Sequence, residues 1–493
     1  MIRRLLIANR GEIALQIIRA CREIGIETVA VYSDADAAAP HALAADRAIG
    51  IGPSAASESY LSIPRMIDAA RAAGADAVHP GYGFLSENAA FAESCTGAGL
   101  VFVGPSPSAL ARMGNKIEAR RTAADAGAPI VPGETPEDQS DAGVQRAIER
   151  VGLPVLVKAA AGGGGKGMRE VHEAQDVVGL VQTARREALA AFGNGTLYVE
   201  RLVPSARHVE VQVFADHHGQ TVHLFERECS AQRRHQKVIE ESPSPALAAT
   251  DPALRTRMTA AAVAAARAVG YRNAGTVEFL VDPASGAFYF LEMNTRLQVE
   301  HGVTEAVTGV DLVRAQLVVA SGEPLPWTQA AISARGHAIE ARVYAEDPAR
   351  GFVPQAGRLL LYREPRMPGV RIDSGVVEGG DVPVQYDPLI AKVIASAETR
   401  PLAIARLAAA LRAFPILGVR TNVEFVIQIL EHPRFQAGTV DTRFLDRETP
   451  SLVSSPDAAP EFVRSAAMAV QPSANDPQSA IRNPHSTWDP WQS

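Results

Sequence analysis

The stretch FYFLEMNTRLQVEH, residues 288–301, places two glutamates, an arginine and a histidine in an otherwise apolar segment. It follows GTVEFLVD, residues 275–282, and both stretches are rich in the aromatic and branched residues that strands favour. The PASGA between them carries Pro, Ser and Gly, which is typical of a hairpin loop. We therefore predict two antiparallel strands joined by residues 283–287.

The register of this predicted hairpin brings two carboxylates together. With a five-residue loop, Asp282 faces Phe288 and Glu278 faces Glu292. Alternation along the second strand puts Asn294 on the same face. Like charges directly opposite each other in a sheet repel, and a cation relieves the repulsion. Two carboxylates and an amide oxygen suit Mg²⁺ bound with substrate phosphates, and the alternative is a solvated face that carries two glutamates.

The composition bounds the class of protein. A chain of 493 residues is long enough for several domains, and 47% apolar residues suffice for packed cores. The net charge of −7 argues against a general nucleic-acid binder, and no apolar run approaches the ~18 residues of a membrane span. The N-terminal apolar run is too short for a signal peptide. The three cysteines show no metal or disulfide spacing, so we expect a reduced, cytoplasmic setting.

The pattern along the chain indicates three domains and a tail. Residues 1–115 alternate predicted strands and helices, which is typical of a doubly wound parallel α/β domain. Residues 116–330 mix helices with hairpin-like strands, which predicts an α+β domain. Residues 331–446 carry short strands, such as GHAIEARVYA, GRLLLYREP and VPVQYDPLIAKVIAS, and then a helix. Residues 447–493 are dominated by Pro, Ser, Ala and Asn, which predicts a mostly disordered tail.

Two loops of the first domain follow predicted strand ends, where ligands bind in parallel sheets. They are ANRGEI and HPGYGFLSEN, and the alternative for the second is a turn that merely needs glycine.

The stretch PVLVKAAAGGGGKGMREV, residues 154–171, predicts a strand, a glycine-rich loop and a second extended run. Consecutive glycines let backbone N–H groups approach a phosphate, and Lys158 and Lys166 add positive charge. It is not a Walker A loop, because Met168 follows Gly167, and no helix signal follows as in a dinucleotide fingerprint. We predict a hairpin lid over phosphates, and the alternative is an ordinary flexible loop.

Polar residues also follow strand patterns in RHVEVQVFAD, residues 207–216, and in ECSAQRRHQKVIEESP, residues 228–243. In the first, alternation predicts valines facing the core and His208, Glu210 and Gln212 on the opposite face. The second clusters arginines with His235 and Lys237, which predicts either a solvated charge run or a site for a small anion or phosphates.

These segments together resemble the biotin carboxylases, the ATP-grasp component of biotin-dependent carboxylases. The matching segments, in the family's order from residue 2 to about 445, are IANRGEIA, HPGYGFLSEN, GNK, GGGGKGM, RHVEVQVFAD, QRRHQK, LEMNTRLQVEH and IEARVYAEDP. EMNTRLQVEH beside QRRHQK is more specific than any glycine motif here. The resemblance implies a doubly wound N-terminal domain, an ATP-grasp domain with a mobile lid over residues 131–203, and a C-terminal biotin carboxylase domain.

The resemblance also implies which residues bind ATP and two Mg²⁺ (or Mn²⁺) ions. The implied metal ligands are Glu278, Glu292 and Asn294, in agreement with the predicted hairpin. The backbone of residues 200–203 is implied to contact the adenine. The implied nucleotide-binding residues are Lys116, Lys158, Gly163, Gly164, Gly165, Lys166, Gly167, Met168, Glu200, Arg201, Leu202, Val203, His208, Gln232, His235 and Leu280.

The implied reaction is the ATP- and bicarbonate-dependent carboxylation of biotin through carboxyphosphate. Glu300 is implied to deprotonate bicarbonate, and Arg342 to stabilise the biotin enolate. The implied catalytic residues are Glu300, Arg296, Lys237 and Arg342. The residues implied to contact bicarbonate or biotin are Lys237, Arg296, Gln298, Val299, Glu300 and Arg342.

Two positions depart from the family pattern. Gly302 stands where the family nearly always has proline, and we expect it to loosen the end of the strand that carries Glu300. Gln16 stands where arginine is common. The family is commonly dimeric, and Arg19 and Glu23, four residues apart on the first predicted helix, serve that interface or simply pair with each other.

The resemblance further implies partners. None of the eight methionines begins the Met-Lys-Met of a biotin acceptor. We therefore expect a biotin carboxyl carrier protein and a carboxyltransferase subunit as separate chains, or a longer polypeptide that has been split. Residues 375–393 and 417–447 resemble the α subunits of methylcrotonyl-CoA or propionyl-CoA carboxylases more than the stand-alone acetyl-CoA component.

Two other functions stay open at this point. A different ATP-grasp ligase would share the Glu278, Glu292 and Asn294 set, but it would need neither biotin nor Arg342. A non-catalytic homologue would bind nucleotide at most, and Gly302 is its only support.

Overall fold

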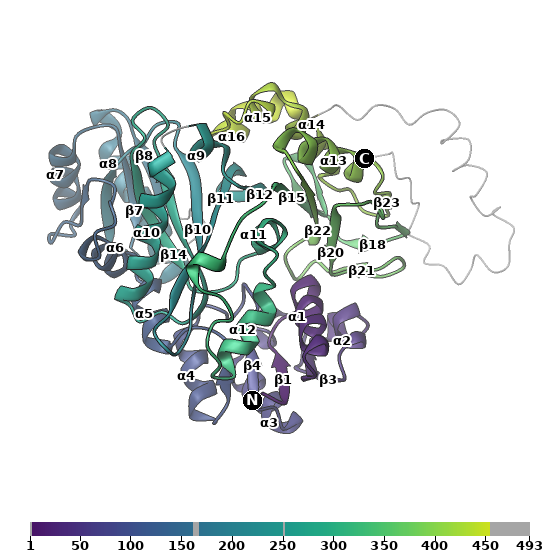
Figure 1. Ribbon diagram of the computed structural model, residues 1–493. Coiled ribbons are helices and arrows are strands. Elements are labelled where there is room, and N and C mark those ends of the chain that lie inside the picture. Colours follow the sequence, from purple (N-terminus) through teal and green to yellow (C-terminus); the bar gives the residue numbers. More distant parts are fainter. Residues whose placement is uncertain (1, 161–166, 250–251, 454–493) are drawn as a thin grey trace, which may run out of the picture.

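The computed structural model describes residues 2–160, 167–249 and 252–453 (Figure 1). Near the N-terminus, five parallel strands form a sheet in the order β3-β2-β1-β4-β5. Its strands are β1 (Arg4–Ile7), β2 (Glu27–Tyr32), β3 (Arg47–Gly50), β4 (Ala77–His79) and β5 (Val101–Phe102). The helices between them are α1 (Gly11–Glu23), α2 (Pro40–Ala44), α3 (Ile63–Ala73) and α4 (Ala89–Gly97). The predicted parallel α/β domain is confirmed.

A second sheet has eight strands and runs through the middle of the molecule, in the order β14-β13-β10-β11-β12-β15-β22-β20. Its strands are β10 (Arg207–Ala215), β11 (Thr221–Arg233), β12 (Gln236–Ser242), β13 (Asn273–Val281), β14 (Phe288–Asn294), β15 (His337–Tyr344), β20 (Val370–Ser374) and β22 (Leu389–Ala397). Because β12 pairs with β15, one sheet joins the two regions that the sequence separates near residue 330.

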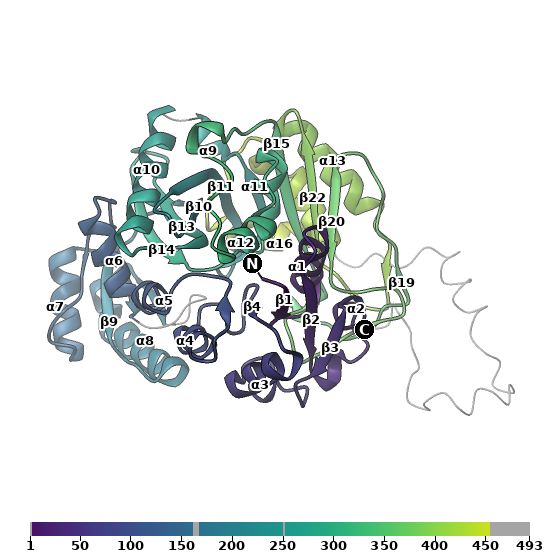
Figure 2. The ribbon, with the colours of Figure 1, turned by 60° about the horizontal axis from the view of Figure 1, so that its bottom comes forward.

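Helices cover this sheet and connect it to the N-terminal domain. They are α5 (Pro107–Gly114), α6 (Lys116–Asp125), α9 (Pro245–Ala249), α10 (Pro252–Ala268), α11 (His301–Thr308), α12 (Leu312–Ala320), α13 (Arg400–Arg412), α14 (Val423–Glu431), α15 (Pro433–Gln436) and α16 (Phe444–Leu452). Figures 1 and 2 both place α11 in the interior and α1 beside β20. In the part of the chain that is described, no helix combines the length and the apolar character needed to cross a membrane.

A four-stranded sheet with two helices forms a separate block at the left of Figure 1. It contains β6 (Gly133–Glu134), β7 (Val155–Ala159), β8 (Met168–Val171), β9 (Leu197–Arg201), α7 (Asp141–Val151) and α8 (Val177–Phe192). β7 and β8 are an antiparallel pair on either side of the glycine-rich stretch, as predicted for a hairpin. Gly163, Gly164, Gly165 and Lys166 of the implied nucleotide set lie outside the described residues.

The hairpin of β13 and β14 has the predicted pairing at its functional end. Glu278 is the direct partner of Glu292. The prediction was wrong nearer the turn, where Val281 and not Asp282 faces Phe288. A β-bulge just beyond the Glu278 pair adds one residue to β14, and a bulge of this kind leaves no mark in the alternation of a short strand.

Two predicted strands of the C-terminal region are broken into shorter pieces. Residues 357–365 contain only β18 (Gly357–Arg358) and β19 (Leu361–Tyr362), and residues 382–396 contain the end of β21 (Asp381–Val382) and most of β22. The break in the second falls on PVQYDP, whose prolines have no N–H for a ladder. The small strands β16 (Glu346–Asp347), β17 (Val353–Pro354) and β23 (Ile416–Leu417) complete this region.

Helix α16 continues to Leu452, past residue 447, where the sequence predicted the disordered tail to begin. The remainder of that predicted tail, residues 454–493, lies outside the described residues.

Glu300 does not lie on a strand, which corrects the expectation about Gly302. β14 ends at Asn294, and Glu300 is the N-cap residue of α11. Gly302 therefore sits in the first turn of a helix. A Cβ added to it would lie 2.5 Å from Cδ1 of Ile394 and 3.2 Å from a carboxylate oxygen of Glu340. The glycine gives room to Ile394, so it belongs to a close contact between α11 and β22.

This contact predicts the effect of enlarging Gly302. Gly302→Ala should cost ~1–3 kcal/mol of unfolding free energy, because the new methyl group displaces Ile394. In an Ile394→Val background, which removes Cδ1, the same change should be neutral or stabilising by up to ~1 kcal/mol, because alanine is the better helix former. Urea denaturation of the four proteins measures this. An equal cost in both backgrounds would contradict the packing explanation.

Candidate active site

Lys237 on β12 lies at the centre of a group of buried carboxylates. Its Nζ is 2.6 Å from Glu210, 2.9 Å from Glu278 and 2.6 Å from Glu300. Burial disfavours the ammonium charge, but the three carboxylates outweigh burial and raise the pKa of Lys237 well above its usual value. The sequence-predicted Lys237, Glu278 and Glu300 are therefore in direct contact.

Glu300 is held between two cations. One carboxylate oxygen contacts Lys237, and the other accepts a hydrogen bond of 2.9 Å from Arg342 on β15. Burial would raise the pKa of Glu300, yet Lys237, Arg342 and Arg227 hold it well below its usual range. Arg342 in turn donates from Nε to Glu240 at 2.6 Å. Glu300 is therefore an ionised carboxylate that is enclosed by protein. It contacts Lys237 and Arg342, the same cations that an anionic substrate would contact.

The residues around Glu300 are also fixed by hydrogen bonds. The side-chain amide of Gln298 donates from Nε2 to Glu278 at 3.0 Å, and its Oε1 accepts from Arg227 at 2.9 Å. Arg296 donates to Glu87 at 3.0 Å and to Oδ1 of Asn294 at 3.2 Å. The structure thus brings the predicted Arg296, Gln298 and Asn294 into one connected network with Glu278 and Glu300.

Several members of this network were not assigned to the site by the sequence analysis, among them Glu210, Glu240, Glu87 and Arg227. Glu87 follows β4 in the HPGYGFLSEN loop, and its place after a strand of a parallel sheet was the available signal. Arg227 is fully buried and uses all five of its N–H donors, on Glu210, Gln212, Thr276, Gln298 and Thr304. No local pattern distinguishes it, because its partners come from four separate segments.

The predicted metal ligands form a set that fits a cation. Glu278 and Glu292 are direct partners across the hairpin, and burial together with Glu278 raises the pKa of Glu292. Among the described residues, the cation paired with Glu292 is Lys116, at 4.0 Å. Asn294 donates to Glu278 at 2.8 Å, and His208 lies 3.1 Å from the other oxygen of Glu278. Glu278 and Glu292 face each other, and the described cation that pairs with Glu292 is as far away as 4.0 Å. Two such carboxylates suit a bound Mg²⁺.

A second cluster contains predicted nucleotide residues. Lys158 on β7 lies 2.5 Å from Glu200 on β9, and Arg120 of α6 also contacts that carboxylate. The Glu200 side chain therefore forms ion pairs with two cations. In the next residues, the N–H groups of Arg201 and Leu202 donate to the carbonyls of Pro132 and Pro154. The N–H groups of residues 201 and 202, at and just past the end of β9, are therefore already paired within the protein and do not face a ligand.

The other predicted nucleotide residues are placed by strands and turns around these clusters. Met168 is the strand partner of Lys158, Leu280 the partner of His208 and Tyr289, and Gln232 the partner of Lys237. His235 and Arg234 form the tight turn between β11 and β12, with φ values of 65° and 49°. Non-glycine residues rarely adopt this conformation, so the turn holds its side chains at a cost in strain.

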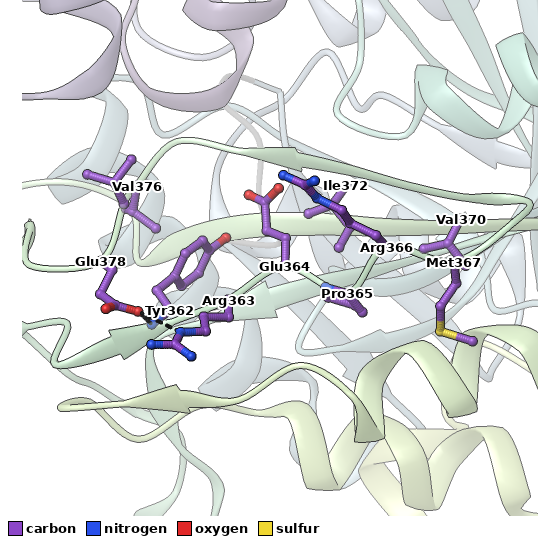
Figure 3. Close-up of a pocket in the computed structure, with 11 residues that line it drawn as sticks. Tyr362, Arg363, Glu364, Pro365, Arg366, Met367, Val370, Ile372, Val376 and Glu378 are labelled. Carbon is purple, nitrogen blue, oxygen red and sulfur yellow. Dashed lines mark hydrogen bonds and ion pairs between the residues drawn. The ribbon is translucent and has the colours of Figure 1, made fainter.

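Figure 3 shows the side chains that line a cavity in the C-terminal region, whose volume is about 740 Å³. It is lined by residues between Tyr362 and Glu378, none of which belongs to the network around Lys237. Its closest charged pair, Arg363 and Glu378 at 3.5 Å, is mostly exposed. The cavity has no group of convergent catalytic side chains, so the buried network is the better candidate for the active site.

Comparisons with known proteins agree with this arrangement. Residues 1–110 match the family model "Biotin carboxylase, N-terminal domain", residues 115–328 match "Carbamoyl-phosphate synthase L chain, ATP binding domain", and residues 340–447 match "Biotin carboxylase C-terminal domain". Biotin carboxylase 1 of Bacillus subtilis (strain 168) is 50% identical over 446 residues, which cover 90% of this chain and 98% of the relative.

A mitochondrial methylcrotonoyl-CoA carboxylase subunit alpha of Oryza sativa subsp. japonica is also 50% identical, over 455 residues. That match covers 92% of this chain but only 61% of the relative, so the chain spans about three fifths of that subunit. Since both kinds of relative are equally similar, identity does not favour one of them.

A solved structure, the biotin carboxylase of Campylobacter jejuni in a complex described as βγ-ATP, superposes with a TM-score of 0.88. It is 44% identical, covering 91% of this chain and 99% of the other. A biotin carboxylase domain dimer from Hydrogenobacter thermophilus 2-oxoglutarate carboxylase, solved with MgADP, ADP and bicarbonate, also gives 0.88. It is 40% identical, covering 92% of this chain and 99% of the other.

The fold and the buried network define an ATP-grasp enzyme, an ATP-dependent ligase. Three family models cover most of the described chain, and biotin carboxylases 1 and 2 of Bacillus subtilis (strain 168) are 50% identical over nearly their whole length. The chain belongs to the biotin carboxylase family.

The ion pairs of Glu300 predict how stability depends on pH. The pKa of Glu300 is lowered in the folded protein, so its contribution is fully present above its unfolded value of ~4.3 and is lost as the pH falls below that value. Glu300→Gln removes this contribution. The stability difference between wild type and variant should be constant above pH ~5.5 and shrink by up to ~1.4 kcal/mol per pH unit below ~4.3. Urea denaturation at a series of pH values measures it, and a difference independent of pH would contradict the assignment.

Proposed function

We propose that this chain carries out the ATP- and bicarbonate-dependent carboxylation of biotin with Glu300 as the base. The observation that carries this proposal is the almost fully buried Glu300 carboxylate, held between Lys237 at 2.6 Å and Arg342 at 2.9 Å. A carboxylate so strongly paired is a weak base. A bicarbonate anion that takes over part of the charge of Lys237 weakens that pairing, so the pKa of Glu300 rises when the substrate is present.

In this proposal, bicarbonate contacts Lys237, Arg296, Gln298 and the backbone of Val299. Glu300 takes the bicarbonate proton, and a bicarbonate oxygen attacks the γ-phosphorus of ATP while the bond to ADP breaks. The product, carboxyphosphate, breaks down to CO₂ and phosphate. The phosphate takes the N1 proton of biotin, and the enolate oxygen that develops on biotin is stabilised by Arg342. N1 then attacks CO₂.

Glu278, Glu292 and Asn294 would hold Mg²⁺ (or Mn²⁺), which supplies neutralisation of the phosphate charges when it is bound. Lys116 and Lys158 add positive charge at the nucleotide. The glycine-rich lid of residues 131–203 covers the phosphates, and the remaining predicted nucleotide residues surround the nucleotide. The Glu200 carboxylate pairs with Lys158 and Arg120, and in this proposal it orients both of these side chains. The proposed division is an N-terminal domain to 115, an ATP-grasp domain to 330 and a C-terminal domain to 446.

The biotin is carried by a separate biotin carboxyl carrier protein, and a carboxyltransferase subunit passes the carboxyl group to an acyl-CoA. The proposed acceptor is acetyl-, propionyl- or methylcrotonyl-CoA. Support comes from the relatives, which include methylcrotonoyl-CoA carboxylase α subunits as well as separate biotin carboxylases. We also propose that the chain forms a homodimer, since a similar solved structure is described as a domain dimer. The proposed location is the cytoplasm, although some relatives are mitochondrial.

ADP release by the purified chain, with Mg²⁺ and bicarbonate and with or without free biotin, tests this function. We expect release that biotin stimulates and that requires bicarbonate. Glu300→Gln should lower it ~10²–10⁴-fold, because the base is lost while the shape of the side chain is kept. Glu431→Gln, which removes an exposed carboxylate paired with Arg412, is the control and should leave the rate unchanged.

Release that is indifferent to biotin would instead favour a different ATP-grasp ligase. Nucleotide binding without any bicarbonate-dependent release, even with a carrier protein present, would favour a non-catalytic homologue. Either result would overturn the proposed function.

A further inference from the structure

The chain uses lysine very sparingly. Among its 48 basic residues, 43 are arginine and only five are lysine. On an exposed surface the two residues serve almost equally well, so a chain with this bias shows arginine wherever either is tolerated. The few lysines that remain mark positions where a compact ammonium group is needed and a planar guanidinium does not serve.

Three of the five lysines belong to the site already described, and a fourth lies outside the described residues. Lys237 joins three carboxylates, Lys158 contacts Glu200, and Lys116 faces Glu292. Lys166 belongs to the glycine-rich stretch, outside the described residues. The fifth is Lys392 on β22, to which neither the sequence motifs nor the proposed reaction gives a role.

Lys392 has no contact with solvent, and its ammonium group is enclosed by oxygen atoms. Its Nζ donates to the carbonyl oxygen of Val299 at 2.7 Å. It lies 3.2 Å from a carboxylate oxygen of Glu12 on α1 and 3.7 Å from one of Asp373 on β20. Burial opposes its charge, but the surrounding carboxylates raise the pKa of Lys392 above its usual value, so it is a cation. An ammonium group can direct its donors separately, which suits a carbonyl acceptor and a carboxylate from different elements, with a second carboxylate nearby.

The Val299 carbonyl belongs to the peptide group that carries Glu300. The Glu300 side chain is held by Lys237 and Arg342, whereas its backbone is held through Lys392. Glu12 contributes to this anchor from the N-terminal domain, and β22 brings Lys392 from the C-terminal region. One ammonium group therefore fixes the start of α11 relative to both domains.

We propose that Lys392 is a positioning residue of the carboxylation site, which holds the Val299–Glu300 peptide so that the Glu300 carboxylate meets bicarbonate. Lys392 does not contact the reactants in this role. The inference rests on the proposed role of Glu300 as the base. A base that is displaced by about 1 Å loses on the order of 100-fold in rate, so the anchor matters for turnover more than for nucleotide binding.

The test compares Lys392→Met with Asp373→Asn in the full chain, by bicarbonate-dependent, biotin-stimulated ADP release and by thermal unfolding. Both variants remove a member of the same buried ion cluster, but only the first removes the bond to Val299. Lys392→Met should lower kcat ~100-fold with the KM for ATP within ~3-fold of wild type. Asp373→Asn should keep kcat within ~3-fold even where its melting temperature falls.

If kcat falls equally in both variants, in proportion to their loss of stability, Lys392 is only a structural cation and the proposal is overturned. Should Lys392→Met fail to fold, Lys392→Arg carries the test, because it keeps the charge but not the shape. It should show the same loss of kcat, and wild-type kcat in that variant would also overturn the proposal. Wild-type protein measured alongside separates a failure of the proposed function, which appears in wild type, from a failure of this inference, which appears only in the variants.

Discussion

The contact on which the rest of the active site depends is the ammonium group of Lys237 among Glu210, Glu278 and Glu300. Three carboxylates enclosed by protein cannot all be ionised without a nearby cation, because desolvation and mutual repulsion both favour protonation. Lys237 lies within 2.9 Å of all three, and its charge lowers the pKa values of Glu278 and Glu300. The same ammonium group contacts both the predicted metal ligand Glu278 and the predicted base Glu300. A change in the contacts of Lys237 therefore alters the electrostatic environment of both carboxylates.

The shared eight-stranded sheet is what makes this contact possible. Lys237 comes from β12 and Arg342 from β15, and the two strands are hydrogen-bonded neighbours. If the C-terminal region were an independent domain, its arginine could reach Glu300 only across a movable interface. Because one sheet carries both cations, their separation is set by the strand ladder itself, and Glu300 is held from both sides.

Local patterns predicted the parts of the site that one hairpin or one strand carries. The facing of Glu278 and Glu292 followed from alternation and loop length, and it is confirmed although a bulge shifts the turn. The roles of the predicted residues stay predictions. What the sequence analysis missed are contacts between distant segments: Glu87 lies 209 positions from Arg296, and Arg227 lies 71 positions from Gln298. Such pairs depend on how sheets pack, which periodicity does not encode.

The buried charges on the α11 side of β15 also limit what the site tolerates. Glu240 and Glu340 are direct partners across β12 and β15, and neither carboxylate oxygen of Glu340 has a hydrogen-bond partner among the described residues. Burial raises the pKa of Glu340 well above its usual value and that of Glu240 to about 7. Burial thus disfavours a charge on Glu340, and Arg342 forms its ion pairs with Glu240 and Glu300. In one cluster of acids, burial therefore raises the pKa values of Glu240 and Glu340, whereas Lys237 and Arg342 lower the pKa of Glu300.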